Sequence, residues 1–107
     1  MPQSPKIFGQ QKPDANIDTN LFTVANSHSA QISIFVANQS NDYDTFTVAL
    51  VPYSQSEQAE NYLAYNTPLV AHGVIAFSGI YLSAGDRVQV ITTLGQCSFT
   101  ATGLDIT

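Results

Sequence analysis

Apolar and polar residues alternate with a period of two along much of this chain, a pattern typical of half-buried β-strands. The run 87–93 places Val88 and Val90 on one face, and the run 97–101 places Phe99 on one face. A three-residue link that contains glycine separates these two runs. We therefore expect the two runs to pair antiparallel as a hairpin.

The same alternation predicts further strands before this hairpin, at 21–25, 30–37, 45–51, 62–66, 69–77 and 80–82. Pro52 and Pro68 should each end a strand, because proline has no N–H to donate to a ladder. The strand 69–77 should bend at His72 and Gly73, and Leu104 with Ile106 should add a final pairing.

Seven or eight short strands spaced by about 8–12 residues predict an all-β fold, an antiparallel β-sandwich. The polar segment 54–60 is the helix candidate, a single turn with Ser54 or Ser56 as its cap. The residues that the alternation places in the core are Phe46, Val48, Val88, Val90 and Phe99.

Residues 1–20 contain three prolines and show no sustained alternation, which predicts an extended N-terminal arm in front of a β-sandwich domain at 21–107. The arm holds both lysines of the chain and an isolated apolar pair. Its candidate interaction residues are Lys6, Ile7, Phe8 and Lys12. The arm can dock on a neighbouring subunit through the apolar pair; the alternatives are a disordered terminus and an arm folded back over its own domain.

Charged residues make up 10% of the chain, against about 25% in typical domains, while 44% of the residues are hydrophobic. A surface of neutral polar side chains tolerates close contact with other proteins, which favours a component of an assembly. The formal net charge of −5 argues against a nucleic acid partner, because binding to phosphates needs clustered lysine and arginine. No stretch of about 20 apolar residues occurs, so we expect no membrane partner.

Candidate catalytic residues do not form a set. Ser27, His28 and Ser29 place hydroxyl groups beside a base, but adjacent loop residues cannot face one another as a triad requires. His72 adds a second histidine, and two histidines do not make a metal site. The single cysteine, Cys97, lies on an apolar face and is expected to be a buried, inert thiol. We expect no enzymatic activity, no cofactor and no metal, with a small hydrolase as the enzyme alternative.

Three tyrosines are candidate interaction residues, because tyrosine offers a large contact area with a polar tip and is favoured at interfaces. Tyr43 lies between Asp42 and Asp44 in a dense turn cluster, whose carboxylates are explained by turn chemistry better than by calcium binding. Tyr62 and Tyr65 should lie on opposite faces of their strand. The alternative is that these tyrosines border the core.

Four segments of the chain, taken in order, resemble small β-sandwich virion proteins of tailed bacteriophages, in particular the cement proteins on cyanophage capsids. The segments are 61–69 (NYLAYNTPL), 73–74 (GV), 78–90 (SGIYLSAGDRVQV) and 97–103 (CSFTATG). The resemblance covers roughly residues 30–107, leaves the arm unmatched and brings no catalytic residues with it.

The resemblance implies a non-enzymatic virion structural protein, above all a capsid cement (decoration) protein that binds across capsid subunits and stabilises the head. It implies the major capsid protein as a partner, with further copies of this chain in a homo-oligomer or lattice. The expected location is the capsid surface, after assembly in the host cytoplasm. The alternative is a tail, baseplate or fibre accessory module that binds a host surface glycan or protein.

Overall fold

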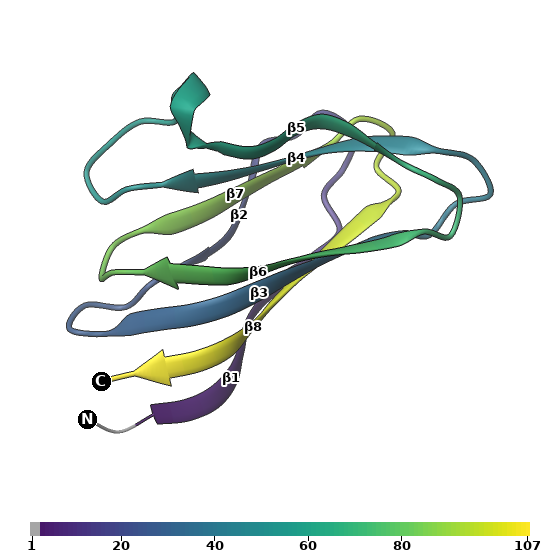
Figure 1. Cartoon of the computed structure of the whole chain (residues 1–107). Helices are drawn as coiled ribbons and strands as arrows, with labels where there is room; N and C mark the ends of the chain where they lie inside the picture. The colour runs from purple at the N-terminus through teal and green to yellow at the C-terminus, as the bar shows by residue number, and fades with distance from the viewer. Residues whose placement is uncertain (1–2) are drawn as a thin grey trace.

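The structure is a computed structural model that describes residues 3–107, and its core is two four-stranded antiparallel sheets packed face to face (Figure 1). Sheet A has the strand order β1 (Gln3–Gln11), β8 (Cys97–Ile106), β3 (Ser29–Asn38) and β6 (Val74–Leu82). Sheet B has the strand order β2 (Thr19–Thr23), β7 (Arg87–Thr92), β4 (Asp44–Val51) and β5 (Tyr62–Leu69). The prediction of an all-β antiparallel sandwich with seven or eight strands is confirmed.

The expected hairpin between the last two strands is wrong. Strand β7 lies in sheet B next to β4, whereas β8 lies in sheet A between β1 and β3 (Figure 1). The link at residues 93–96 therefore crosses from one sheet to the other. Each strand buries one face in either arrangement, so the alternation of side chains could not distinguish a hairpin from a crossover.

The N-terminal residues also differ from the expected arm. Residues 3–11 form β1, which pairs antiparallel with β8 from Gln3 opposite Ile106 to Gln11 opposite Phe99. The register shifts between Ile7 and Gly9, so the strand carries a bulge, and this irregularity together with Pro5 hid the strand from the alternation pattern. Of the arm alternatives, the structure has the one in which the segment folds back on its own domain. Met1 and Pro2 lie outside the described residues.

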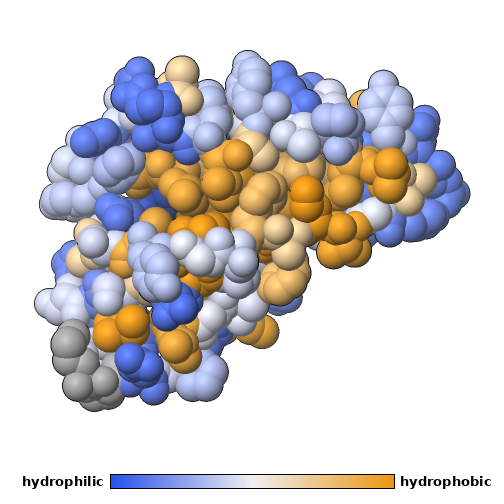
Figure 2. Space-filling model, viewed as in Figure 1, coloured by the Kyte–Doolittle hydropathy of each residue, from blue (hydrophilic) through white to orange (hydrophobic). Residues whose placement is uncertain are grey.

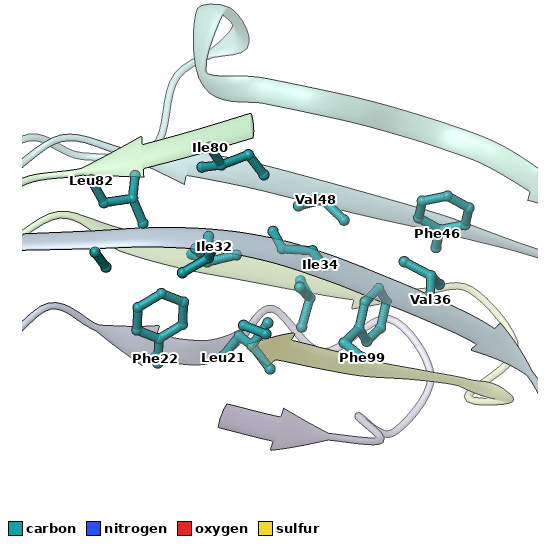
Figure 3. Close-up of a cluster of buried hydrophobic side chains, with 14 of the residues drawn as sticks. Leu21, Phe22, Ile32, Ile34, Val36, Phe46, Val48, Ile80, Leu82 and Phe99 are labelled. Carbon is teal, nitrogen blue, oxygen red and sulfur yellow. The ribbon is translucent and has the colours of Figure 1, made fainter. Parts of the chain in front are cut away.

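The core is built from inward-facing side chains of both sheets (Figure 3). All five residues predicted to face inward are at most 1% exposed: Phe46, Val48, Val88, Val90 and Phe99. The Phe46 and Phe99 rings meet edge to face across the sandwich, with 6.3 Å between centroids. Cys97 is fully buried, as expected, and this burial raises the pKa of its thiol to about 11.

Three local predictions need correction. Pro68 lies inside β5 instead of ending it, which the sheet tolerates because β5 is an edge strand. His72 and Gly73 belong to the turn between β5 and β6, where His72 adopts a φ of 56°, and β6 then runs without a break through residues 80–82. The single helical turn is the 3-10 helix η1 (Ala59–Asn61), which follows Gln58 and not either predicted serine. Within residues 3–107, no helix has the length and apolar character needed to cross a membrane.

Candidate interaction surface

One continuous segment of the chain, along one side of the sandwich, carries no charged side chain. Residues 61–85 include no aspartate, glutamate, lysine or arginine. They form β5, the turn at 70–73 and β6. Strand β5 is an edge strand of sheet B, β6 is an edge strand of sheet A, and both lie on the same side of the molecule (Figure 1). We call residues 61–85 the uncharged flank. Figure 2 shows hydrophobic side chains gathered in a band across the face on which these two strands lie.

The uncharged flank is an outward continuation of the core. Half-buried apolar side chains pack against the core along this side, namely Leu50, Ala64, Ile75 and Phe77. Beyond them, large side chains are mostly exposed: Tyr65 (63%), Val70 (70%), Val74 (66%) and Tyr81 (72%). Exposed apolar side chains in an uncharged segment of this kind are typical of a protein interface.

Tyr62 and Tyr65 lie together on this flank, so the expectation that they occupy opposite faces is wrong. Their ring centroids are 4.8 Å apart, and with Ala59 they line a shallow depression of about 370 Å³. Two register shifts between β4 and β5 break the alternation on which the expectation rested. The Tyr62 hydroxyl donates to Glu57 Oε2 at 3.2 Å. Burial, followed by this hydrogen bond and the Glu57 charge, raises the pKa of Tyr62.

Tyr43 projects from the β3–β4 loop at one end of the sandwich, 59% exposed, and buried polar groups hold the backbone around it. The buried Asn38 amide donates through Nδ2 to the carbonyl oxygens of Asp42 (2.8 Å), Leu69 (3.0 Å) and Val70 (3.2 Å). These bonds join the loop before β4 to the turn between β5 and β6. Asn38 is also the first residue of a formal glycosylation sequon, and in the folded chain its side chain is buried.

Asp44 is the second buried polar group at this end, and it has a structural role. Its carboxylate accepts hydrogen bonds from Thr92 Oγ1 (2.5 Å) and from three backbone N–H groups, those of Thr45 (2.7 Å), Leu94 (2.9 Å) and Gln96 (3.1 Å). Burial alone would raise the pKa of Asp44, but these four hydrogen bonds outweigh it and lower the pKa. The sequence placed Asp44 in a surface turn and contained no signal for this buried role.

The candidate residues of the N-terminal segment mostly contact their own domain. Lys6 Nζ lies 3.7 Å from Asp105 Oδ2, and Lys12 Nζ donates to the Gly95 carbonyl at 3.0 Å. The Phe8 ring packs against Phe22, with 5.0 Å between centroids. Ile7, in contrast, is 60% exposed. The structure therefore does not bring the N-terminal candidates together with Tyr62 and Tyr65, because β1 and β5 lie at opposite edges of their sheets.

The two histidines take part in separate hydrogen bonds. His28 Nδ1 lies 2.8 Å from Asp105 Oδ1, and His72 Nε2 lies 2.7 Å from Asn41 Oδ1. The hydrogen bond from His28 is the main cause that lowers the pKa of Asp105. Among residues 3–107, no three histidine, cysteine or acidic side chains gather as metal ligands would.

Together these observations define a small antiparallel β-sandwich whose residues 61–85 are uncharged and expose several large apolar side chains. No protein-family model matches the chain, and a search of curated proteins finds no match. Among solved structures, the chain is similar to part of a chain in the structure of infectious bursal disease virus, Gx strain. The TM-score is 0.52 at 12% sequence identity, over 97% of this chain and 31% of the viral chain. The likeness at this identity concerns the fold.

Proposed function

We propose that this protein is a non-enzymatic structural component of a virion, a capsid cement protein that binds across subunits of the major capsid protein on the capsid surface. The observation that carries the proposal is the uncharged flank, which exposes large apolar side chains over two consecutive edge strands, one of each sheet. A free monomer gains nothing from such a surface, whereas a protein that is covered by neighbours buries it and gains free energy.

Two further observations support a virion role. The chain resembles phage cement proteins over segments that include most of the uncharged flank, and its fold is similar to part of a chain from a virus particle. The N-terminal segment is a poorer candidate for the contact, because Lys6, Phe8 and Lys12 already bind groups of their own domain.

Cryo-electron microscopy of particles that contain this chain tests the proposal. A cement protein is expected in hundreds of copies over the junctions between capsid subunits, with residues 61–85 facing a neighbour. The matched variants are Val70→Glu, on the flank, and Ile7→Glu, at the opposite edge, since both side chains are apolar and similarly exposed. We expect Val70→Glu to lower the occupancy of the particle and Ile7→Glu to leave it unchanged. Equal loss in both variants, or absence of the chain from the capsid, contradicts the proposal.

A second function is favoured by one specific observation. The paired rings of Tyr62 and Tyr65 form an aromatic surface, and such a surface can stack on a sugar ring. This arrangement fits a tail, baseplate or fibre module that binds a host glycan. Glycan-array binding that is lost in Tyr65→Ala, together with a low copy number per particle, would establish this function in place of the first.

A further inference from the structure

The four edge strands of the sandwich differ in how they are protected against pairing with another chain. Within residues 3–107, β1 carries Pro5, Lys6 and a bulge, and β2 is five residues long with a register shift of its own. Strand β5 carries Pro68 and two register shifts. Prolines, charges, bulges and short length are the usual devices that keep an edge from accepting a further strand.

Strand β6 has nine residues with no proline and no charge. One register shift, beside Gly79, interrupts its pairing with β3 and leaves a regular stretch at 74–77. This stretch contains β-branched and aromatic residues, which favour strand pairing. The edge at 74–77 is therefore the one that is open to a further strand.

The direction of the backbone groups at this edge follows from the register. Asn38 N donates to the Gly73 carbonyl at 2.9 Å, and hydrogen-bonded pairs alternate with non-hydrogen-bonded pairs along an antiparallel ladder. Ile75 is thus bonded to β3, whereas Val74 and Ala76 direct their N–H and C=O groups away from the sheet. The side chains of Val74 and Ala76 are also exposed. These backbone groups require an extended strand as their partner and not a helix or a small molecule.

The charge distribution indicates which strand fits. The chain has a net charge of −5, so two copies repel each other wherever their acidic groups approach. Residues 61–85 carry none of these groups, and two copies can meet there without a like-charge contact. A partner with charged side chains would find no counter-charge on this flank. The surface complementary to a neutral apolar edge is another neutral apolar edge, and β6 of a second copy provides one.

We propose that β6 pairs antiparallel with β6 of a second copy about a two-fold axis, which joins two A sheets into one continuous eight-stranded sheet. Val74 then lies opposite Ala76 of the second copy, and the two Ile75 residues face each other at the axis. This register forms about four backbone hydrogen bonds and uses only the regular stretch of the strand. The inference rests on the proposed function only in so far as a capsid lattice needs contacts between copies. The pairing itself is expected in the purified chain, without any capsid protein.

Analytical ultracentrifugation of the purified chain over a range of concentrations tests the pairing. The matched variants are Val74→Glu on β6 and Gln10→Glu on β1, which change the net charge equally and both replace exposed residues. We expect the wild type to dimerise, Val74→Glu to raise the dimer dissociation constant about tenfold or more, and Gln10→Glu to leave it unchanged. A second variant, Ala76→Pro, removes an N–H that the monomer does not use, so it should abolish the dimer while circular dichroism stays that of a β-sandwich.

Cross-linking tests the register. Facing residues in a non-hydrogen-bonded pair have Cα atoms about 4.5 Å apart, which a disulfide can bridge. Ile75→Cys should therefore form a disulfide-linked dimer under mild oxidation, whereas Gln10→Cys should not, and the buried Cys97 should not interfere. A wild type that stays monomeric, equal effects of the two glutamate variants, or a dimer that Ile75→Cys fails to cross-link overturns the inference. A dimer in solution that is absent from capsids contradicts the proposed function alone, and a capsid-bound monomer contradicts the pairing alone.

Discussion

The Thr92 hydroxyl donates a 2.5 Å hydrogen bond to the buried carboxylate of Asp44, and this bond joins the end of β7 to the start of β4. The same carboxylate accepts the N–H groups of Leu94 and Gln96, so it holds the link through which the chain crosses to sheet A. Asp44 is therefore expected to control the connection between the two sheets.

Replacement of Asp44 by asparagine should destabilise the fold strongly. The amide would turn an N–H donor toward groups that are themselves donors, and buried donors would lose their acceptor. We expect a loss of about 2–3 kcal/mol in the free energy of unfolding, measured by chemical denaturation. Asp42→Asn, at the exposed neighbouring position, is the control and should change stability by about 0.5 kcal/mol or less. Similar losses in the two variants would contradict the role given to Asp44.

Acid should destabilise the protein through Asp44 and Asp105. The pKa of each carboxyl is lowered in the folded state from the ordinary value of 3.8, by hydrogen bonds at Asp44 and chiefly by His28 at Asp105. A group with a lowered folded pKa contributes stability above its unfolded pKa and loses it as the pH falls through the folded value. Unfolding followed from pH 6 to pH 2 should show stability falling below about pH 4, and Asp44→Asn should flatten this fall. A fall of the same steepness in the variant would exclude Asp44 as its source.

The ionisation of Glu57 should have the opposite effect on stability, because it should destabilise the folded state as the pH rises. Burial, and next the charge of Asp18, raise the pKa of Glu57 from its ordinary value of 4.5, and its Oε1 is buried without a hydrogen-bond partner. A raised folded pKa favours the folded state below the unfolded pKa, and this contribution is lost as the pH rises through the folded value. Glu57→Gln, which removes the charge and keeps an acceptor for Tyr62, should therefore be more stable than the wild type at pH 7 and no more stable at pH 4. Glu60→Gln, at an exposed carboxyl, is the control.

Truncation of Phe99 to alanine should remove a central part of the core. The side chain is fully buried and packs against Phe46, so we expect a loss of about 3–5 kcal/mol in the free energy of unfolding. Phe35→Ala, at a ring that is 41% exposed on the outer face of β3, should cost much less. Thermal and denaturant unfolding of the pair checks the difference, and equal losses would mean that Phe99 does not anchor the core.

Two neighbours in β1 test whether this strand is part of the fold. Phe8 packs on Phe22, whereas Ile7 is largely exposed. We expect Phe8→Ala to lower the free energy of unfolding by about 1–3 kcal/mol and Ile7→Ala to leave it nearly unchanged. The backbone amides of residues 3–11 that are hydrogen-bonded to β8 should exchange as slowly as the amides of β8. Fast exchange in residues 3–11, together with no effect of Phe8→Ala on stability, would instead support the extended arm that was predicted from the sequence.

Side-chain alternation was sufficient to predict the inward faces of the regular strands. Val88, Val90 and Phe99 are buried as predicted, because a period of two assigns each residue to a face whatever strand lies beside it. The absence of charge in residues 61–85 is likewise visible in the sequence alone. Alternation failed where the ladder is irregular, at the bulged β1 and at the shifted register that brings Tyr62 and Tyr65 together.

The pairing of strands was decided only by the tertiary structure. A short link between β7 and β8 is compatible with a hairpin or a crossover. In the folded chain the link is held by Asp44, a residue about 50 positions away that accepts hydrogen bonds from its backbone. The same is true of the proposed interaction surface, because an uncharged strand becomes an open edge only when no other strand of the chain lies beside it. Local sequence determines which face of a strand is apolar; long-range packing determines which strand is its neighbour and which edge is left for another molecule.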